Sequence, residues 1–510
     1  MLVRKHKAQF DDAPPQDHAP TKRRTAPQLK DDGQSTTNCV ASHKHLKTQR
    51  KGDVRLAKRR VINTAPIQPL EIYCFGGGEA GELGFGGQKG TLRISRPRFN
   101  PLLTPDRAGV VQFSVGGMHT AAITSDKKIL TWGVNDLGAL GRDTTWEAPV
   151  RDISETDGVN SGSDDDSEED EINPFESTPT EIDLTALPGR PTFTQVACAD
   201  SSTFAVTDEG LVYGWGTFRG NQGVYGYSPS VEVQKKPALV RGLQKITKLC
   251  CGENHVLALD VQGQVYTWGS GQQNQLGRRL IERHMDQKRS LTPEKVWLPK
   301  GIVDIGAGQF HSFAVHQNGD VYSWGLNNFG QTGQPLRQDE TGSDAHLPQI
   351  VKSLQQIGKI ISVTGGNHHS LAITDGGECL AWGRVDAGQT GLKLDRLPPQ
   401  HLVLNFRGHP RILTVPTPVP GIDAVLVAAG TDHSLALSRE GKAYSWGFNE
   451  YCQTGVSSEN QVDEATMLDS KAIKEKKVVW ADCGGQFSVI ATLPGTINHS
   501  TTANGINGQM

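Results

Sequence analysis

The sequence predicts an all-β protein, a seven-bladed β-propeller closed by its N- and C-terminal strands. An aromatic residue followed by glycine recurs seven times, and a Gly-x-x-His-(Ser/Thr) motif precedes most copies. The stretch between the two motifs is typical of two short strands joined by a turn. One such unit cannot bury both faces of its sheet, whereas seven units in a ring can. The pairs are Phe75-Gly76, Trp132-Gly133, Trp215-Gly216, Trp268-Gly269, Trp324-Gly325, Trp382-Gly383 and Trp446-Gly447.

The chain begins with a basic segment, residues 1–65, which contains 15 Lys and Arg residues against six Asp residues. It has four prolines and no apolar periodicity, so we expect a disordered tail before the propeller of residues 66–493. An acidic insert at about residues 151–180 lengthens the interval between the second and third aromatic–glycine pairs, and we expect it to be disordered. Residues 494–510 are polar and are predicted to form a flexible tail.

The first and last repeats are each incomplete. No histidine motif precedes Phe75-Gly76, and no aromatic–glycine pair follows the last predicted strand at residues 477–480 and the motif-like stretch 484–488. The two partial repeats supply each other's missing parts. We therefore expect strands from both ends of the chain to pair within one blade and close the ring.

The repeated tryptophans and histidines are predicted to be structural. Each tryptophan occupies the same position of its unit, where it should pack in the core; photochemical use is the alternative. The histidines occur one per blade, too dispersed for a shared metal site, so we expect them to hydrogen-bond neighbouring backbone. They are His119, His255, His311, His369 and His433, with Ser202 and Phe487 at the same position in two other repeats.

Composition and motifs argue against several other classes. No stretch of about 18 apolar residues is present, so we expect no membrane span. Eight scattered cysteines without a CxxC pair argue against a disulfide scaffold or a zinc module. The motifs GxxxxGK(S/T), HExxH and GxSxG are missing. We expect no metal, no cofactor and no covalent chemistry; an enzyme that uses the central channel would need ionisable residues converging on the axis.

The third repeat departs from the glycine turn that follows the other tryptophans. Its glycines permit a sharp excursion, and three apolar residues, Phe218, Val224 and Tyr225, should form its tip. We expect this segment to protrude as a wedge into a protein partner; an ordinary variant loop is the alternative. The segment is Phe218, Arg219, Gly220, Asn221, Gln222, Gly223, Val224 and Tyr225.

The loop before each repeated histidine should lie on the same rim of the ring. Asp200, Asn254 and His368 occupy this loop in repeats three, four and six, and Arg278 follows the glycine turn of repeat four. Polar side chains gathered on one rim could meet a partner together, although each one alone is typical of a solvated surface.

The seven repeats and the wedge segment together resemble the regulator of chromosome condensation family. The resemblance implies a guanine-nucleotide exchange factor that promotes GDP release and GTP loading on the small GTPase Ran. It implies that the wedge pushes against the nucleotide site and that Asp200, Asn254 and His368 act on the displaced loops of the GTPase. It also implies that Arg278 anchors an acidic patch of the partner. The family carries Asp where this chain has Asn254.

Basic clusters in the tail predict contacts with DNA phosphate or acidic protein surfaces such as histones, without base readout. The second cluster has the spacing of a two-part nuclear import signal, which an import receptor would bind. The resemblance implies a chromatin-associated protein in the nucleus, and a solubilising tail is the alternative. The residues are Lys22, Arg23, Arg24, Arg50, Lys51, Lys58, Arg59 and Arg60.

A second reading of the whole chain is a non-catalytic propeller scaffold that binds chromatin or another protein through the same rim. The two functions differ in the role of the wedge. An exchange factor loses activity when the wedge is altered, whereas a scaffold keeps its partner.

Overall fold

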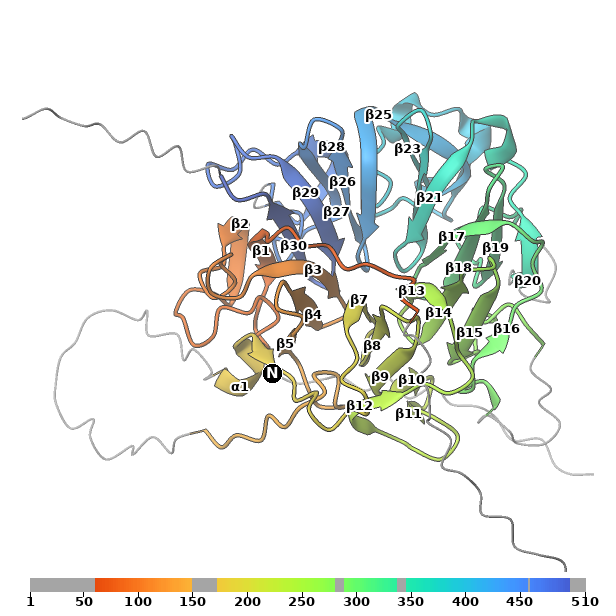
Figure 1. Cartoon of the computed structure of the whole chain (residues 1–510). Helices are drawn as coiled ribbons and strands as arrows, with labels where there is room; N and C mark the ends of the chain where they lie inside the picture. Colours follow the sequence, from red (N-terminus) through yellow and green to blue (C-terminus); the bar gives the residue numbers. More distant parts are fainter. Residues whose placement is uncertain (1–59, 149–171, 280–288, 337–344, 457–458, 496–510) are drawn as a thin grey trace, which may run out of the picture. The chain divides into compact units, whose positions relative to one another are not determined.

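The computed structural model describes residues 60–148, 172–279, 289–336, 345–456 and 459–495, which all belong to the compact unit Arg59–Met510. Regular structure in these residues is nearly all β-strand (Figure 1). The strands form seven antiparallel blades of four strands each, two of which are joined through one long strand. The predicted all-β, seven-bladed fold is confirmed.

Four antiparallel strands, named in their order across the sheet, build each blade. Blade 1 contains β29 (Val478–Cys483), β30 (Phe487–Thr492), β1 (Glu71–Gly77) and β2 (Arg93–Phe99). Blade 2 contains β3 (Val110–Val115), β4 (His119–Thr124), β5 (Ile129–Gly133) and β6 (Thr180–Glu181). Blade 3 contains β7 (Phe193–Cys198), β8 (Ser202–Thr207), β9 (Val212–Gly216) and β12 (Gln234–Leu239).

Blade 4 contains β13 (Ile246–Cys251), β14 (His255–Asp260), β15 (Val265–Gly269) and β16 (Glu294–Lys295). Blade 5 contains β17 (Ile302–Ala307), β18 (His311–His316), β19 (Val321–Gly325) and β20 (Ala345–Ile350). Blade 6 contains β21 (Ile360–Gly365), β22 (His369–Thr374), β23 (Glu378–Arg384) and the first part of β25 (Pro410–Ala429). Blade 7 contains the rest of β25, β26 (His433–Ser438), β27 (Ala443–Phe448) and β28 (Gln461–Met467).

Short elements lie in the connections. They are the helix α1 (Pro174–Ser177), the 3-10 helices η4 (Leu354–Gln356), η5 (Leu394–Arg396) and η6 (Pro399–His401), and the strand β24 (Leu402–Leu404), which pairs with β25. No helix among the described residues has the length and apolar character needed to cross a membrane.

The ends of the propeller meet in blade 1, as the two incomplete repeats predict. Strand β1 pairs with β30 in a register that places Tyr73 opposite Ile490 (Figure 1). The first strands of the blades contact one another in the order β3, β7, β13, β17, β21, β25 and β29, and β29 returns to β3. The N–H group of Gly485 also donates to Gly117 O at 2.9 Å, which joins blade 1 to blade 2. The ring is therefore closed by strands far apart in the sequence.

The recurring tryptophan–glycine pair has a steric explanation. Each of the six tryptophans is fully buried, as expected for core residues. In blade 5, the glycine after the tryptophan is Gly325, with a φ of 107°. A Cβ atom there would lie 2.7 Å from the Cα of His311, so any larger side chain would push the neighbouring strand away.

The repeated histidines join neighbouring blades through side chains. We expected the histidine rings to bond backbone groups, and this expectation is wrong for Nε2. The second strand of the next blade places a Ser or Thr hydroxyl beside that atom. That hydroxyl donates in turn to a backbone carbonyl, as Ser312 Oγ does to Gln275 O at 2.9 Å, so Nε2 carries the proton and donates. The pairs are His119–Thr203 and His255–Ser312 at 2.8 Å, His311–Ser370 at 2.7 Å, and His369–Ser434 and His433–Ser488 at 2.9 Å.

Two segments that we expected to be disordered contain ordered residues at the ends that adjoin the propeller. Within the expected tail, the Asn63 side chain donates to Thr207 O at 2.9 Å and to Ile246 O at 2.8 Å, which ties blades 3 and 4 together. Within the expected insert, Asn173 caps α1 and donates to Thr144 O at 2.9 Å. Side-chain amides satisfy backbone groups in both segments, which composition did not reveal. Residues 1–59, 149–171 and 496–510 lie outside the described residues.

Candidate functional site

One edge of the ring collects the predicted site residues. Asp200, Asn254 and His368 lie in turns between the first and second strands of blades 3, 4 and 6. The N–H of Asp200 donates to Glu253 O at 2.9 Å, and the N–H of Glu253 donates to Gln309 O of blade 5 at 3.2 Å. The loops between the third and fourth strands of the blades lie on the same edge. We call this edge the loop rim. The opposite edge, with the turns between second and third strands, is the hairpin rim.

The predicted wedge is a hairpin on the loop rim of blade 3. It consists of β10 (Phe218–Gly220) and β11 (Gly223–Gly226), with Asn221 and Gln222 in the turn between them. Gly223 has a φ of 110°, which suits a residue without a side chain. We keep the name wedge for residues 218–226.

The tip of the wedge differs from the sequence expectation. Phe218 is fully buried, and its ring stacks on Phe204 with centroids 5.8 Å apart. Tyr225 is half-buried, and its hydroxyl lies 2.9 Å from Ser290 Oγ of blade 4. Only Val224 of the three apolar residues is exposed, at 40%. Phe218 therefore anchors the base, because the core between blades 3 and 4 has room for its ring.

The base of the wedge meets two of the predicted rim residues. Asn254 is 6% exposed, and its Oδ1 accepts the backbone N–H of Arg219 at 2.6 Å. The guanidinium of Arg219 lies 3.8 Å from Asp200 Oδ2, which also accepts the hydroxyl of Ser201 at 2.9 Å. Asn254 thus holds the wedge backbone, while Asp200 and Arg219 keep part of their charge accessible to a partner.

Glu253 is a member of this cluster that sequence reasoning missed. Burial, followed by the negative charge of Asp200, raises the pKa of Glu253 to about 7. Its Oε1 accepts the Asn254 amide at 3.2 Å, so it also orients the side chain that holds the wedge. Glu253 directly precedes Asn254 in a loop that the sequence had already indicated as part of the rim. This position was the signal that could have identified it.

His368 lies in a separate aromatic and basic cluster on blade 6. Its ring stacks on Phe329 with centroids 4.5 Å apart, and the guanidiniums of Arg384 and Arg411 lie 5.4 and 4.8 Å from the Phe329 centroid. Burial first, then the charge of Arg384, lowers the pKa of His368 to about 4. His368 is neutral at physiological pH and offers a hydrogen bond rather than a charge. Phe329 was not predicted.

Arg278 does not occupy the predicted exposed position. Its side chain is 8% exposed and pairs with Glu294 at 3.1 Å. The same guanidinium donates to Ser290 O and Thr292 O at 3.3 Å. This burial argues against the expected role as an anchor for a partner's acidic patch, because the loop before β16 folds over the guanidinium and uses its donors. Burial lowers the pKa of Arg278 below its usual value.

The basic residues predicted for chromatin and import lie almost entirely outside the described residues. Arg60 is the exception, and it is exposed. Asn63, three residues later, contacts the hairpin rim through Thr207 O at the end of β8. Asn63 is thus attached on the edge opposite the wedge.

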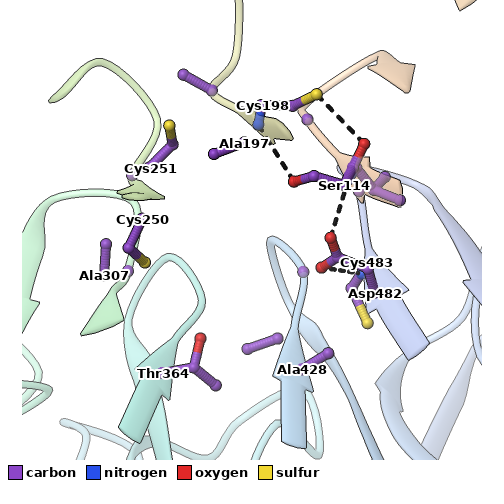
Figure 2. Close-up of a pocket in the computed structure, with 18 of the residues that line it drawn as sticks. Ser114, Ala197, Cys198, Cys250, Cys251, Ala307, Thr364, Ala428, Asp482 and Cys483 are labelled. Atoms are coloured by element: carbon purple, nitrogen blue, oxygen red, sulfur yellow. Dashed lines mark hydrogen bonds between the residues drawn. The ribbon is translucent and has the colours of Figure 1, made fainter. Parts of the chain in front are cut away.

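A cavity of about 370 Å³ lies in the channel between the first strands of the blades (Figure 2). Asp482 projects into it and accepts the N–H groups of Val115 at 2.9 Å and Cys483 at 3.0 Å. Burial raises the pKa of Asp482 to about 6 and that of Cys198 to about 12. Cys198 therefore stays protonated, unlike a nucleophilic cysteine. No group of three or more metal-ligating side chains occurs in the described part of the chain.

The fold and the loop rim define a class of protein: a seven-bladed propeller with an exposed hairpin on one rim. The chain belongs to the RCC1-like domain family, which matches residues 71–490. This family is the one suggested by the seven repeats.

Individual relatives extend over most of the chain. The protein is 41% identical to Protein pim1 of Schizosaccharomyces pombe over 88% of this chain and 79% of the relative. It is 36% identical to the guanine nucleotide exchange factor SRM1 of Saccharomyces cerevisiae, over 83% and 87% of the two chains. Solved structures of yeast Prp20p match with TM-scores of 0.75 and 34% identity. One was described with its binding to Gsp1p and histones (85% of this chain, 95% of that one), the other bound to Kap60 (88% and 96%).

Proposed function

We propose that this protein is a guanine-nucleotide exchange factor that promotes GDP release and GTP loading on a Ran GTPase at chromatin. The observation that carries the proposal is the wedge, a hairpin fixed at its base and exposed at its tip, on a chain similar to a named exchange factor. It forms no covalent bond, so it is not an enzyme in the sense of converting a substrate.

The mechanism follows from reciprocal binding. A GTPase holds its nucleotide through phosphate-loop amides and Mg²⁺, so spontaneous release is slow. The propeller binds the nucleotide-free form more tightly, and coupling requires that this binding weaken nucleotide affinity by the same factor. GTP then replaces GDP because it is the more abundant nucleotide, and the factor imposes no direction.

Different parts of the loop rim contribute in different ways. The exposed wedge residues, with Gln222 and Val224 at the tip, displace the elements that hold phosphate and Mg²⁺. Asp200 and Arg219 offer opposite charges beside the wedge, and neutral His368 offers a hydrogen bond on blade 6. Asn254 acts from beneath by fixing Arg219.

The tail supplies location and further partners. We place the protein in the nucleus, where its basic clusters contact DNA phosphate and histones and where an import receptor recognises residues 50–60. The support is the charge pattern and the two Prp20p structures, described with histones and with Kap60. Asn63 contacts the hairpin rim, which is the edge opposite the loop rim that we assign to the GTPase.

The test is release of a fluorescent GDP analogue from purified Ran by catalytic amounts of the full chain. The variant is Gln222→Ala with Val224→Ser, which alters the tip and leaves buried Phe218 in place. The control is Val303→Ser, an exposed valine elsewhere on the propeller.

We expect fast release with wild type and control and at least about tenfold slower release with the tip variant, a loss of about 1.4 kcal/mol in transition-state stabilisation. No acceleration by the folded wild-type protein would overturn the proposal. Partner binding with no acceleration in any variant would favour the scaffold function.

A further inference from the structure

The wedge belongs to blade 3 in sequence, but blade 4 holds it in position. In a two-stranded hairpin the N–H groups of alternate residues point outward and have no partner within the pair. On this side of the hairpin these are the N–H groups of Arg219 in β10 and of Asn221 in the turn, whereas Phe218 and Gly220 pair with residues of β11. Two side chains of blade 4 accept the outward donors, in the places that a third strand would fill.

Asn254 and Gln272 are these acceptors. Asn254 Oδ1 accepts Arg219 N–H at 2.6 Å, and Gln272 Oε1 accepts Asn221 N–H at 2.8 Å. The neighbouring Gln273 adds a longer contact of 3.5 Å from its amide to Asn221 Oδ1. The second bond acts at the turn of the hairpin, whereas the first acts at its base, so Gln272 controls how the tip is aimed.

Gly220 also fits this arrangement. A Cβ atom at Gly220 would lie 2.9 Å from Gln272 Oε1 and 3.1 Å from the Tyr225 ring. The glycine therefore lets the Gln272 side chain lie directly against the hairpin. This explains a glycine whose φ does not require one, in contrast to Gly223.

The blade 3–blade 4 seam lacks the histidine–hydroxyl bond that joins other blades. Ser202 stands where the histidine would be, and Val256 stands where the hydroxyl would be. Gln195 exchanges two hydrogen bonds with the backbone of Leu249 across this seam, at 2.9 and 3.0 Å, as Gln112 does with Val196 between blades 2 and 3. On the loop rim, contacts between the wedge and blade 4 complete this seam.

We infer that Gln272 is a positioning residue that fixes the wedge through Asn221 for insertion into the nucleotide site of the GTPase. The inference rests on the proposed exchange function. Gln272 touches no reacting group; it restricts the orientations of the tip, so more of the partner complexes begin with the wedge correctly aimed.

The experiment compares Gln272→Leu, which removes the acceptor, with Gln272→Glu, which keeps it. Gln262→Leu is the matched control, because Gln262 is an exposed glutamine of the same blade on the hairpin rim. Nucleotide exchange on Ran gives kcat and KM, and hydrogen–deuterium exchange of the peptide containing Asn221 reports the bond without any GTPase.

We expect Gln272→Leu to lower kcat about fivefold with little change in KM, since one hydrogen bond is lost and the rest of the rim still docks. The Asn221 peptide should exchange faster in this variant. Gln272→Glu should restore both readouts, and Gln262→Leu should match wild type. Gly220→Ala should resemble Gln272→Leu, because it displaces the glutamine.

Unchanged kcat and unchanged peptide protection in Gln272→Leu would overturn the inference, as would a Gln272→Glu variant as defective as Gln272→Leu. If wild type itself accelerates no release, the exchange function fails. Peptide protection then still decides whether Gln272 fixes the wedge.

Discussion

His433 Nε2 lies 2.9 Å from Ser488 Oγ and joins blade 7 to the strand β30 that pairs with the N-terminal strand β1. The same bond recurs between other blades, and each acceptor hydroxyl is buried between two sheets. Because these bonds span residues far apart in the chain, they stabilise the ring rather than any single blade. Their contribution can be measured separately from the function of the rim.

Thr203→Val should lower the free energy of unfolding by about 1–3 kcal/mol, because it leaves the buried Nε2–H of His119 without an acceptor. Thr120→Val is the matched control: Thr120 occupies the same strand position, and its hydroxyl has no partner among the described residues. Urea unfolding of both variants tests this. Equal losses in the two variants would show that the histidine bond contributes nothing.

His433→Gln should make stability less dependent on pH. Burial lowers the pKa of His433 to about 3, below the value of about 6.5 in the unfolded chain. Protons therefore bind the unfolded state first, and wild type loses stability as the pH falls from about 6.5 towards 3, by up to about 1.4 kcal/mol per pH unit.

The glutamine variant lacks this loss, so its deficit relative to wild type should shrink between pH 7 and pH 5. Unfolding curves at three pH values measure the difference. A deficit that stays constant would contradict a buried neutral histidine.

Phe218→Ala and Val224→Ser should separate the two ends of the wedge. Phe218 is fully buried, so its truncation should cost about 3–5 kcal/mol of stability and should also disorder the hairpin. Val224 is exposed, so Val224→Ser should leave the unfolding free energy within about 0.5 kcal/mol and should slow nucleotide exchange. Thermal unfolding and nucleotide-exchange rates, measured on the same preparations, test both predictions. Full exchange activity in Val224→Ser would contradict a role for the wedge tip.

Arg278→Met should destabilise the fold without a specific effect on partner binding. Removal of the guanidinium takes a buried partner from Glu294, which keeps its pair with Arg289, and removes donors from two backbone carbonyls. We expect a cost of about 2 kcal/mol, since Glu294 is partly exposed. Arg279→Met is the control, because Arg279 is adjacent and exposed. A stable Arg278→Met protein with a raised KM for Ran would restore the role that the sequence first indicated.

The sequence determined the fold because each blade contains its own short-range sequence motifs. In blade 5, the buried Trp324, the left-handed Gly325 and the hairpin turn at Asn318-Gly319 can be recognised within about a dozen residues. The sevenfold recurrence of the aromatic–glycine pair sets the number of blades. The missing halves of the first and last repeats also predicted the pairing of β1 with β30, because an open sheet edge needs a partner.

Only the tertiary structure decided what the individual side chains do. Phe218, Asn254 and Arg278 were assigned to a partner from their positions in the repeat, yet packing between blades 3 and 4 buries all three side chains. Gln272 had no local signal, because its partner Asn221 lies 51 residues earlier in the chain. Local patterns fix backbone conformation, whereas burial and hydrogen-bond partners depend on which blades become neighbours in the closed ring.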